Sequence, residues 1–159
     1  MITRGRASGP VPDAPLPSRG RLLAIDWGEV RIGLAVTDET QLIASPLETL
    51  VRRRGKRFPM PRFLQLIAEL EPAGLLVGLP LDSDGREGES AIRARELAGL
   101  VRERTGLPVA LVDERMTTAR ALAAVREQGG SVRGRKQDVD SLAASLLLQQ
   151  YLESRRPVE

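Results

Sequence analysis

The chain has 159 residues, which is the size of one domain with a single hydrophobic core and too short for two. It contains no Cys and no His, and this excludes disulfides, zinc–thiolate sites, cysteine nucleophiles, His-ligated metals and Ser-His-Asp triads. The formal net charge is +3, and Lys56 and Lys136 are the only lysines, so arginine supplies nearly all of the positive charge.

The first twenty residues, MITRGRASGPVPDAPLPSRG, are rich in Pro, Gly and Ser. They lack an apolar run long enough for a signal peptide or a membrane span. We therefore expect a disordered tail over 1–20, a globular domain over 21–155 and a short tail over 156–159. We also expect a cytoplasmic protein with no membrane partner.

The first part of the domain has the pattern of antiparallel strands. Residues 21–27 (RLLAIDW) alternate weakly and stop at Gly28, and residues 31–38 (RIGLAVTD) resume the apolar pattern, which predicts a hairpin. A third strand is predicted over 42–51. Pro59 and Pro61 then open a helix whose apolar residues have helical spacing, namely Phe63, Leu66, Ile67 and Leu70.

Strands and helices alternate in the second part of the domain. The apolar runs GLLVGLP (74–80) and VALVDE (109–114) predict strands that are buried on both faces. A glycine-rich loop is predicted over 129–137. Helices are predicted over 91–101, 117–128 and 139–154. Antiparallel strands followed by β–α units predict an α/β fold with one mixed sheet.

Three acidic residues follow or interrupt these apolar segments: Asp26, Glu114 and Asp140. Side chains alternate along a strand, so Asp26 and Glu114 each share an apolar face that contains an alanine. These companions are Leu22, Ala24, Ala110 and Val112. An alanine lets a helix approach the sheet closely, and we expect the three acids to converge on that face.

The last helix carries two candidate acids, Asp138 and Asp140, and only one of them can face the sheet. Two helical steps rotate a side chain by about 200°, so the two point in nearly opposite directions. The stripe from Asp138 is mixed in polarity. The stripe from Asp140 is mostly small or apolar and continues through Ala143, Ala144, Leu147 and Tyr151. We therefore predict that Asp140 faces the sheet.

Each acid taken singly has a structural explanation, either as a turn former or as a complement to the helix dipole. Three acids that converge need another explanation. Two carboxylates about 4 Å apart repel by roughly 4 kcal/mol at an effective dielectric of 20, and a hard divalent cation removes that conflict. We predict two Mg²⁺ or Mn²⁺ ions, roughly 3.5–4 Å apart, of the kind that hydrolyses phosphodiester bonds.

Four segments in this order resemble one family: IDWGEVRIGLAVTD (25–38), VGLPLDSDGREG (77–88), DERMTT (113–118) and DVDSLAASLLLQQYLE (138–153). The family is the YqgF family of ribonuclease H-like proteins, also called RuvX, which is related to Holliday junction resolvases. The segments span nearly the whole globular chain, and DERMTT is the most specific of them.

The resemblance implies a ribonuclease H-like domain, with a five-stranded mixed sheet flanked by helices and catalytic, metal-binding acids at Asp26, Glu114 and Asp140. It implies a nuclease that matures the 5′ end of pre-16S rRNA, with branched DNA as a second substrate class. We expect a monomer or weak homodimer. Two positions depart from the family pattern. Gln137 replaces a fourth acid of classical resolvases, and Val30 replaces a common lysine.

Several basic and hydroxyl residues are candidates for nucleic-acid contacts. Arg31 lies in the hairpin, and Arg115 follows Glu114 directly. Thr117 and Thr118 open a predicted helix, where a helix cap and a phosphate contact are compatible. The loop before Asp140 carries Arg133, Arg135 and Lys136, for which a solvated charge run is the alternative. Codon usage in a GC-rich genome is the alternative explanation for the arginine content.

The turn segments and the low aromatic content add two expectations. Gly78, Pro80 and Gly85 are expected to shape the rim of the site. Aromatic residues make up 3% of the chain, which argues against a platform for stacking single-stranded bases.

Two other functions fit parts of the sequence. The segment IDWGEVRIG (25–33) also fits the phosphate loop of sugar kinases and actin, but those proteins have two such halves and this chain has one Asp-x-Gly hairpin. A non-catalytic protein that binds rRNA or DNA and keeps the fold is the other alternative. The three intact acids argue against it.

Overall fold

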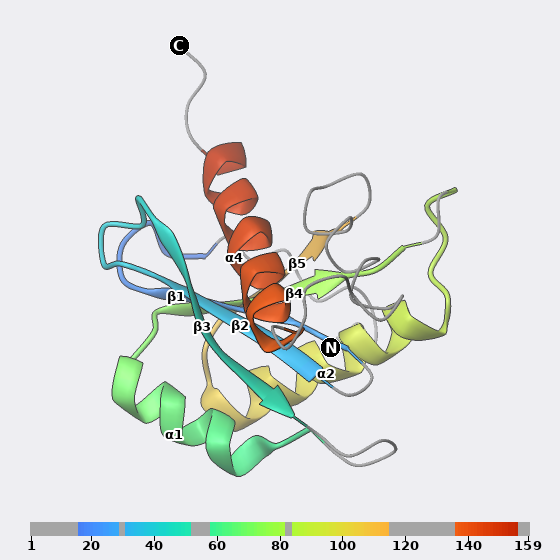
Figure 1. Ribbon diagram of the computed structural model, residues 1–159, viewed down its shortest axis with the longest axis horizontal. Coiled ribbons are helices and arrows are strands. Elements are labelled where there is room, and N and C mark those ends of the chain that lie inside the picture. The colour runs from blue at the N-terminus through green and yellow to red at the C-terminus, as the bar shows by residue number, and fades with distance from the viewer. Residues whose placement is uncertain (1–15, 29–30, 52–57, 82–83, 115–135, 156–159) are drawn as a thin grey trace, which may run out of the picture.

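The computed structural model describes residues 16–28, 31–51, 58–81, 84–114 and 136–155, with the backbone alone for 136–140. The described strands form one mixed five-stranded sheet in the order β3-β2-β1-β4-β5 (Figure 1). Their bounds are β1 Leu22–Asp26, β2 Arg31–Thr37, β3 Ala44–Val51, β4 Gly74–Leu79 and β5 Val109–Asp113. Strands β1, β2 and β3 pair antiparallel, whereas β4 pairs parallel to both β1 and β5.

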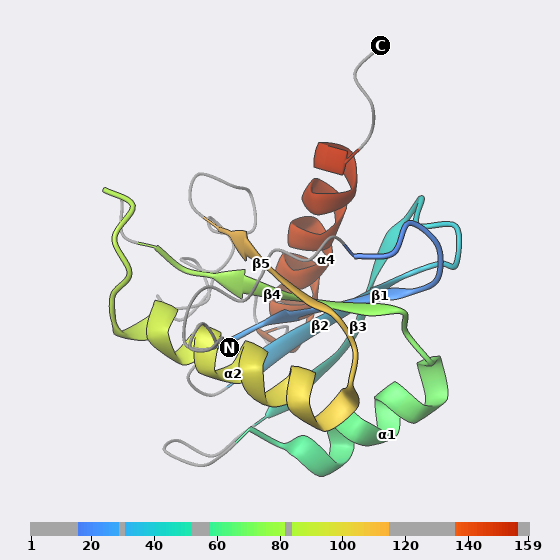
Figure 2. The ribbon, with the colours of Figure 1, turned by 180° about the vertical axis from the view of Figure 1, so that it is seen from behind.

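The described helices cover both faces of this sheet. Their bounds are α1 Met60–Leu70, α2 Glu89–Thr105 and α4 Lys136–Arg155. Helix α4 crosses one face over β1, β2 and β3, while α1 and α2 pack on the other, as Figures 1 and 2 show from opposite sides. None of these helices is long and apolar enough to span a membrane.

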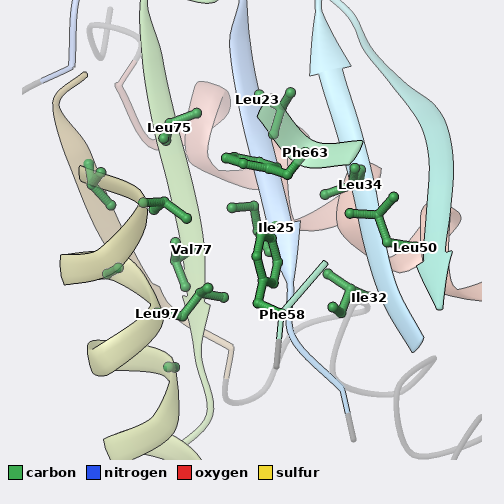
Figure 3. Packing of buried hydrophobic residues seen from close by; sticks show 14 of the residues in the cluster. Leu23, Ile25, Ile32, Leu34, Leu50, Phe58, Phe63, Leu75, Val77 and Leu97 are labelled. Carbon is green, nitrogen blue, oxygen red and sulfur yellow. The ribbon is translucent and has the colours of Figure 1, made fainter. Parts of the chain in front are cut away.

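The larger of two apolar cores lies between the sheet and helices α1 and α2. Strand residues of alternating position point into it, among them Leu23, Ile25 and Val77 (Figure 3). Phe63 of α1 fills its centre and is fully buried, and it meets Phe58 edge to face with ring centroids 5.2 Å apart. The predicted helical spacing in this segment is therefore confirmed, and α1 ends where Glu71 adopts a left-handed conformation.

The smaller core lies between the sheet and α4. Its strand members occupy the other alternating positions, and its helix members are small or apolar. Among them are Leu22, Ala24, Ala35, Leu76, Ala110, Ala144, Leu147 and Leu148. The alanines allow α4 to approach the sheet closely, as the sequence predicts. This face of the sheet is the one to which Asp26 and Glu114 belong.

The segment 16–20 differs from the expectation of a disordered tail through residue 20. Leu16 is 2% exposed and packs in the smaller core. Arg155 of α4 donates hydrogen bonds to the carbonyl oxygens of Leu16 and Pro17, and Gln41 donates to those of Pro17 and Gly20. The Pro-rich composition of this segment does not indicate that one of its leucines is buried. Nor does it indicate that side chains from distant parts of the chain bind the backbone carbonyls around that leucine. Residues 1–15, the rest of the predicted tail, lie outside the described residues.

Replacing Leu16 by Ala should therefore lower the free energy of unfolding by about 2–5 kcal/mol, because it empties a site in a closed core. Urea unfolding measures this change. The matched control is Leu42→Ala, since Leu42 is 59% exposed and its removal should cost no more than about 0.5 kcal/mol. Equal effects of the two substitutions would show that Leu16 contributes nothing to the core.

Helix α4 begins earlier than the sequence pattern predicts. It starts at Lys136 and not near Val139, so Lys136 and Gln137 belong to the helix and not to the preceding loop. Gly134 is the last glycine before this helix, and Lys and Gln are good helix formers, so nothing after Gly134 stops the helix from extending backwards. The predicted helix over 117–128 lies outside the described residues.

Candidate active site

Asp26 is the last residue of β1 and is 1% exposed. It pairs across the antiparallel ladder with Gly33 of β2. On its other side, Ile25 pairs with Val77 of β4, so Asp26 and Gly78 are the residues that directly follow this pair in the two parallel strands. Side-chain alternation places Asp26 on the face of Leu22 and Ala24, beneath α4. Gly33, which pairs with Asp26, and Gly78, which follows the partner of Ile25, both lack a side chain.

Glu114 directly follows β5 and is 4% exposed. Its backbone N–H donates a hydrogen bond of 3.1 Å to the carbonyl oxygen of Leu79, which extends the pairing of β5 with β4 by one residue. Its side chain lies over Gly78: a Cβ built on that glycine would be 2.7 Å from Glu114 Oε2. The Glu114 carboxylate therefore reaches across β4 toward the strand that carries Asp26.

The backbone of Asp140 lies near the start of α4, and its neighbour Ser141 fixes where that part of the helix lies. Ser141 is 4% exposed, and its hydroxyl shares a hydrogen bond of 2.7 Å with the Thr49 hydroxyl. Thr49 of β3 pairs with Gly33, which pairs with Asp26. The first turns of α4 thus lie over the row of the sheet that contains Asp26.

The predicted nucleic-acid contacts are only partly described. Arg31 begins β2 on the same face as Gly33, two residues away, and is half-buried. Lys136 begins α4. Arg115, Thr117, Thr118, Arg133 and Arg135 lie outside the described residues.

The turn after β4 forms one rim of this end of the sheet. Leu81 and Glu87 make an isolated antiparallel bridge, and Gly85 between them has a φ of 88°, which a glycine adopts without strain. Arg95 of α2 donates from Nε to Glu87 Oε1 at 2.7 Å. This hydrogen bond and the guanidinium charge hold the pKa of the Glu87 carboxyl below its ordinary value.

The donor set at this edge fits a hard divalent cation. Asp26 and Glu114 are two buried carboxylates on one face, and such oxygen ligands suit Mg²⁺ and Mn²⁺. The missing side chain of Gly78 leaves room for the Glu114 carboxylate over β4. Among the side chains that the structure describes, no three acidic groups form a metal-holding cluster. The side chain of Asp140, the third predicted ligand, is outside that set.

Sequence reasoning missed the hydrogen bond between Thr49 and Ser141. The two residues are 92 positions apart, and neither has a local pattern that marks it. The sequence predicts only that Gly78 shapes the rim, whereas its neighbour in the structure is the Glu114 carboxylate. The apolar run 74–80 could have given this signal, because a glycine inside a buried strand marks a close approach.

Comparison with known proteins identifies the family. The family described as "RuvX: Holliday junction resolvase" matches residues 20–154. A protein of Mycobacterium sp. (strain KMS) named "Putative pre-16S rRNA nuclease" is 38% identical over 150 residues, covering 92% of this chain and 89% of that relative. A relative of the same name from Anaeromyxobacter sp. (strain Fw109-5) is 42% identical over 135 residues, covering 85% and 98%.

A solved structure shows the same fold. The structure of "T. thermophilus RuvC in complex with Holliday junction substrate" superposes with a TM-score of 0.52 at 20% identity, over 86% of this chain and 95% of that one. The predicted ribonuclease H-like fold with a mixed five-stranded sheet is thereby confirmed. The chain belongs to the RuvX family of nucleases.

Proposed function

We propose that this nuclease depends on divalent metal ions held by Asp26, Glu114 and Asp140, and that it hydrolyses phosphodiester bonds in structured nucleic acid. One observation carries the proposal: the Glu114 carboxylate lies over Gly78, the strand neighbour of the buried Asp26. Both acids thus lie at the same end of the sheet, where the parallel strands β1 and β5 finish. The start of α4 lies over the row of residues that contains Asp26.

The chemistry of these side chains supports a metal more than a structural role. Two buried carboxylates on one face repel each other. A divalent cation bound by both removes that repulsion, whereas a purely structural role gives no reason to place the two acids on the same face. When bound, Mg²⁺ or Mn²⁺ would supply an activated water and stabilise the leaving oxygen of the phosphodiester. The three acids would hold the ions and thereby orient the scissile phosphate at this edge.

Pre-16S rRNA is the substrate that we propose, in its 5′ maturation, with branched DNA second. The names of the curated relatives support RNA, and the family description supports junction DNA. Classical resolvases have a fourth acid at the position of Gln137. Its replacement by glutamine favours RNA over junction DNA as the substrate. The proposed compartment is the cytoplasm, where pre-rRNA would be met.

Incubating the purified protein with pre-16S RNA and with a four-way DNA junction, in Mg²⁺, Mn²⁺ or EDTA, tests this choice. We expect cleavage of the RNA at its 5′ side with either metal, weaker cleavage of the junction and none in EDTA. Preferred cleavage of the junction would contradict the assignment of the substrate. Binding without cleavage under every condition would support a non-catalytic binding protein instead.

The basic residues just before α4 and at its first position are proposed to contact phosphate. Changing Arg133, Arg135 and Lys136 together to Ala should weaken RNA binding and flatten its dependence on salt. Each phosphate that the variant no longer neutralises should lower the slope of log K against log salt by about 0.7–0.9. Binding titrations between low and moderate salt measure the slope. The control variant carries Arg102→Ala and Arg104→Ala in the last turn of α2. If the triple variant leaves the slope unchanged, as the control should, then Arg133, Arg135 and Lys136 contact only solvent.

A further inference from the structure

We infer that Gly78 is a positioning residue of the nuclease site, because its missing side chain provides the place that the Glu114 carboxylate occupies beside Asp26. The inference rests on the proposed role of Glu114 as a metal ligand. It adds the requirement for a glycine at position 78 of β4, the strand that lies between β1 and β5.

The geometry around Gly78 leaves no room for a methyl group. A Cβ there would be 2.7 Å from Glu114 Oε2, 3.0 Å from Glu114 Cδ and 3.0 Å from Leu147 Cδ2. Carbon and oxygen atoms that are not bonded to each other do not approach to 2.7 Å without repulsion, so one of these groups has to move.

The group that moves is the Glu114 carboxylate. The backbone of Gly78 cannot shift easily, since β4 is paired with β1 on one side and with β5, through Val112, on the other. Leu147 is fully buried in the core beneath α4, so it can give only slightly. The carboxylate is the far end of a flexible side chain, so it moves more easily than the paired backbone or the packed leucine.

A substitution at this position should therefore separate stability from metal binding. The fold tolerates a displaced carboxylate, but a metal site needs its ligands held to within about 0.5 Å of their productive positions. Gly78→Ala should bind Mn²⁺ at least tenfold more weakly than the natural sequence and need correspondingly more metal for half-maximal cleavage.

Gly74 offers a matched control on the same strand and face. The three atoms nearest to a Cβ there would all be apolar: Leu16 Cδ2 at 3.2 Å, Leu22 Cδ2 at 3.2 Å and Pro17 Cδ at 3.4 Å. Gly74→Ala therefore crowds the same core without touching the site. Gly99→Ala is a second control, because a Cβ there would meet nothing within 4 Å.

The experiment measures Mn²⁺ binding by calorimetry without nucleic acid, and melting temperature in EDTA, for the full chain and the three alanine variants. We expect Gly78→Ala and Gly74→Ala to shift melting similarly, while only Gly78→Ala loses at least tenfold in Mn²⁺ affinity. Equal Mn²⁺ affinities of Gly78→Ala and Gly74→Ala would overturn the inference.

A double variant tests the steric conflict itself. Glu114→Asp shortens the side chain by one methylene and withdraws the carboxylate from position 78, so Gly78→Ala should cost less than threefold in affinity in that background. An undiminished penalty there, or failure of both Gly78→Ala and the double variant to fold, would overturn the inference and assign Gly78 to the sheet alone.

Failure of the proposed function gives a different result. If Asp26→Asn binds Mn²⁺ as well as the natural sequence, the acids do not hold metal, and the proposed function fails together with this inference. If Asp26→Asn loses binding and Gly78→Ala keeps it, the proposed function stands and only the role of Gly78 is overturned.

Discussion

Asp26→Asn should abolish cleavage while the protein stays folded. The substitution keeps the shape of the side chain and removes the negative charge that the proposed metal site needs at the end of β1. Losing a metal ligand removes several kcal/mol of transition-state stabilisation, which is on the order of 10³-fold or more in rate. The free energy of unfolding in EDTA should stay level or rise, because the substitution removes the repulsion between buried carboxylates on one face of the sheet.

The measurements are cleavage rate in Mg²⁺ and urea unfolding in EDTA, for Asp26→Asn beside a control. Asp38→Asn is suitable, since Asp38 lies exposed in the turn after β2, where it accepts hydrogen bonds from Thr40 and Leu42. We expect this control to cleave normally. Both variants are purified in the same way, so that contaminating nuclease is excluded. Full activity of Asp26→Asn would then contradict the metal-site proposal.

The second large effect distinguishes the two acids near the start of α4. Asp138 and Asp140 both lie within the helix, two residues apart, so their backbone positions are separated by about 200° around the helix axis. Asp140 precedes Ser141, which is buried against Thr49. It also lies three and four residues before Ala143 and Ala144, both fully buried against the sheet. Asp140→Asn should lose nearly all metal-dependent cleavage, and Asp138→Asn should keep most of it.

Cleavage assays across a range of Mg²⁺ concentrations compare the two variants. The loss in Asp140→Asn should appear at every concentration, because a ligand has been removed. If Asp138→Asn is the inactive variant and Asp140→Asn is active, the phase of the helix relative to the site is the reverse of the one proposed, and the third ligand is Asp138.

The parts of this fold that follow from alternation and helical spacing could be predicted from sequence. Asp26 falls on the face of Leu22 and Ala24 because strands have a period of two, and the alanines indicate where α4 packs. The order of antiparallel hairpins and β–α units likewise predicts the mixed sheet, and the structure has it. These features depend on neighbours in the sequence.

Features that depend on distant partners could not be predicted in this way. Leu16 looks like part of a Pro-rich tail until Arg155 and the smaller core are placed around it. The hydrogen bond between Thr49 and Ser141 joins residues with no shared pattern. The packing of Glu114 over Gly78 depends on how far a side chain reaches across a neighbouring strand, and strand register alone does not specify that reach.

The central claim is that buried carboxylates at one edge of the sheet make this chain a metal-dependent nuclease. The most direct test is the rate of pre-16S RNA cleavage by the full chain after EDTA treatment, followed by titration with Mg²⁺ or Mn²⁺. The claim predicts no cleavage in EDTA and full recovery with added metal in the natural sequence, with no recovery in Asp26→Asn. Cleavage that continues unchanged in EDTA would contradict it.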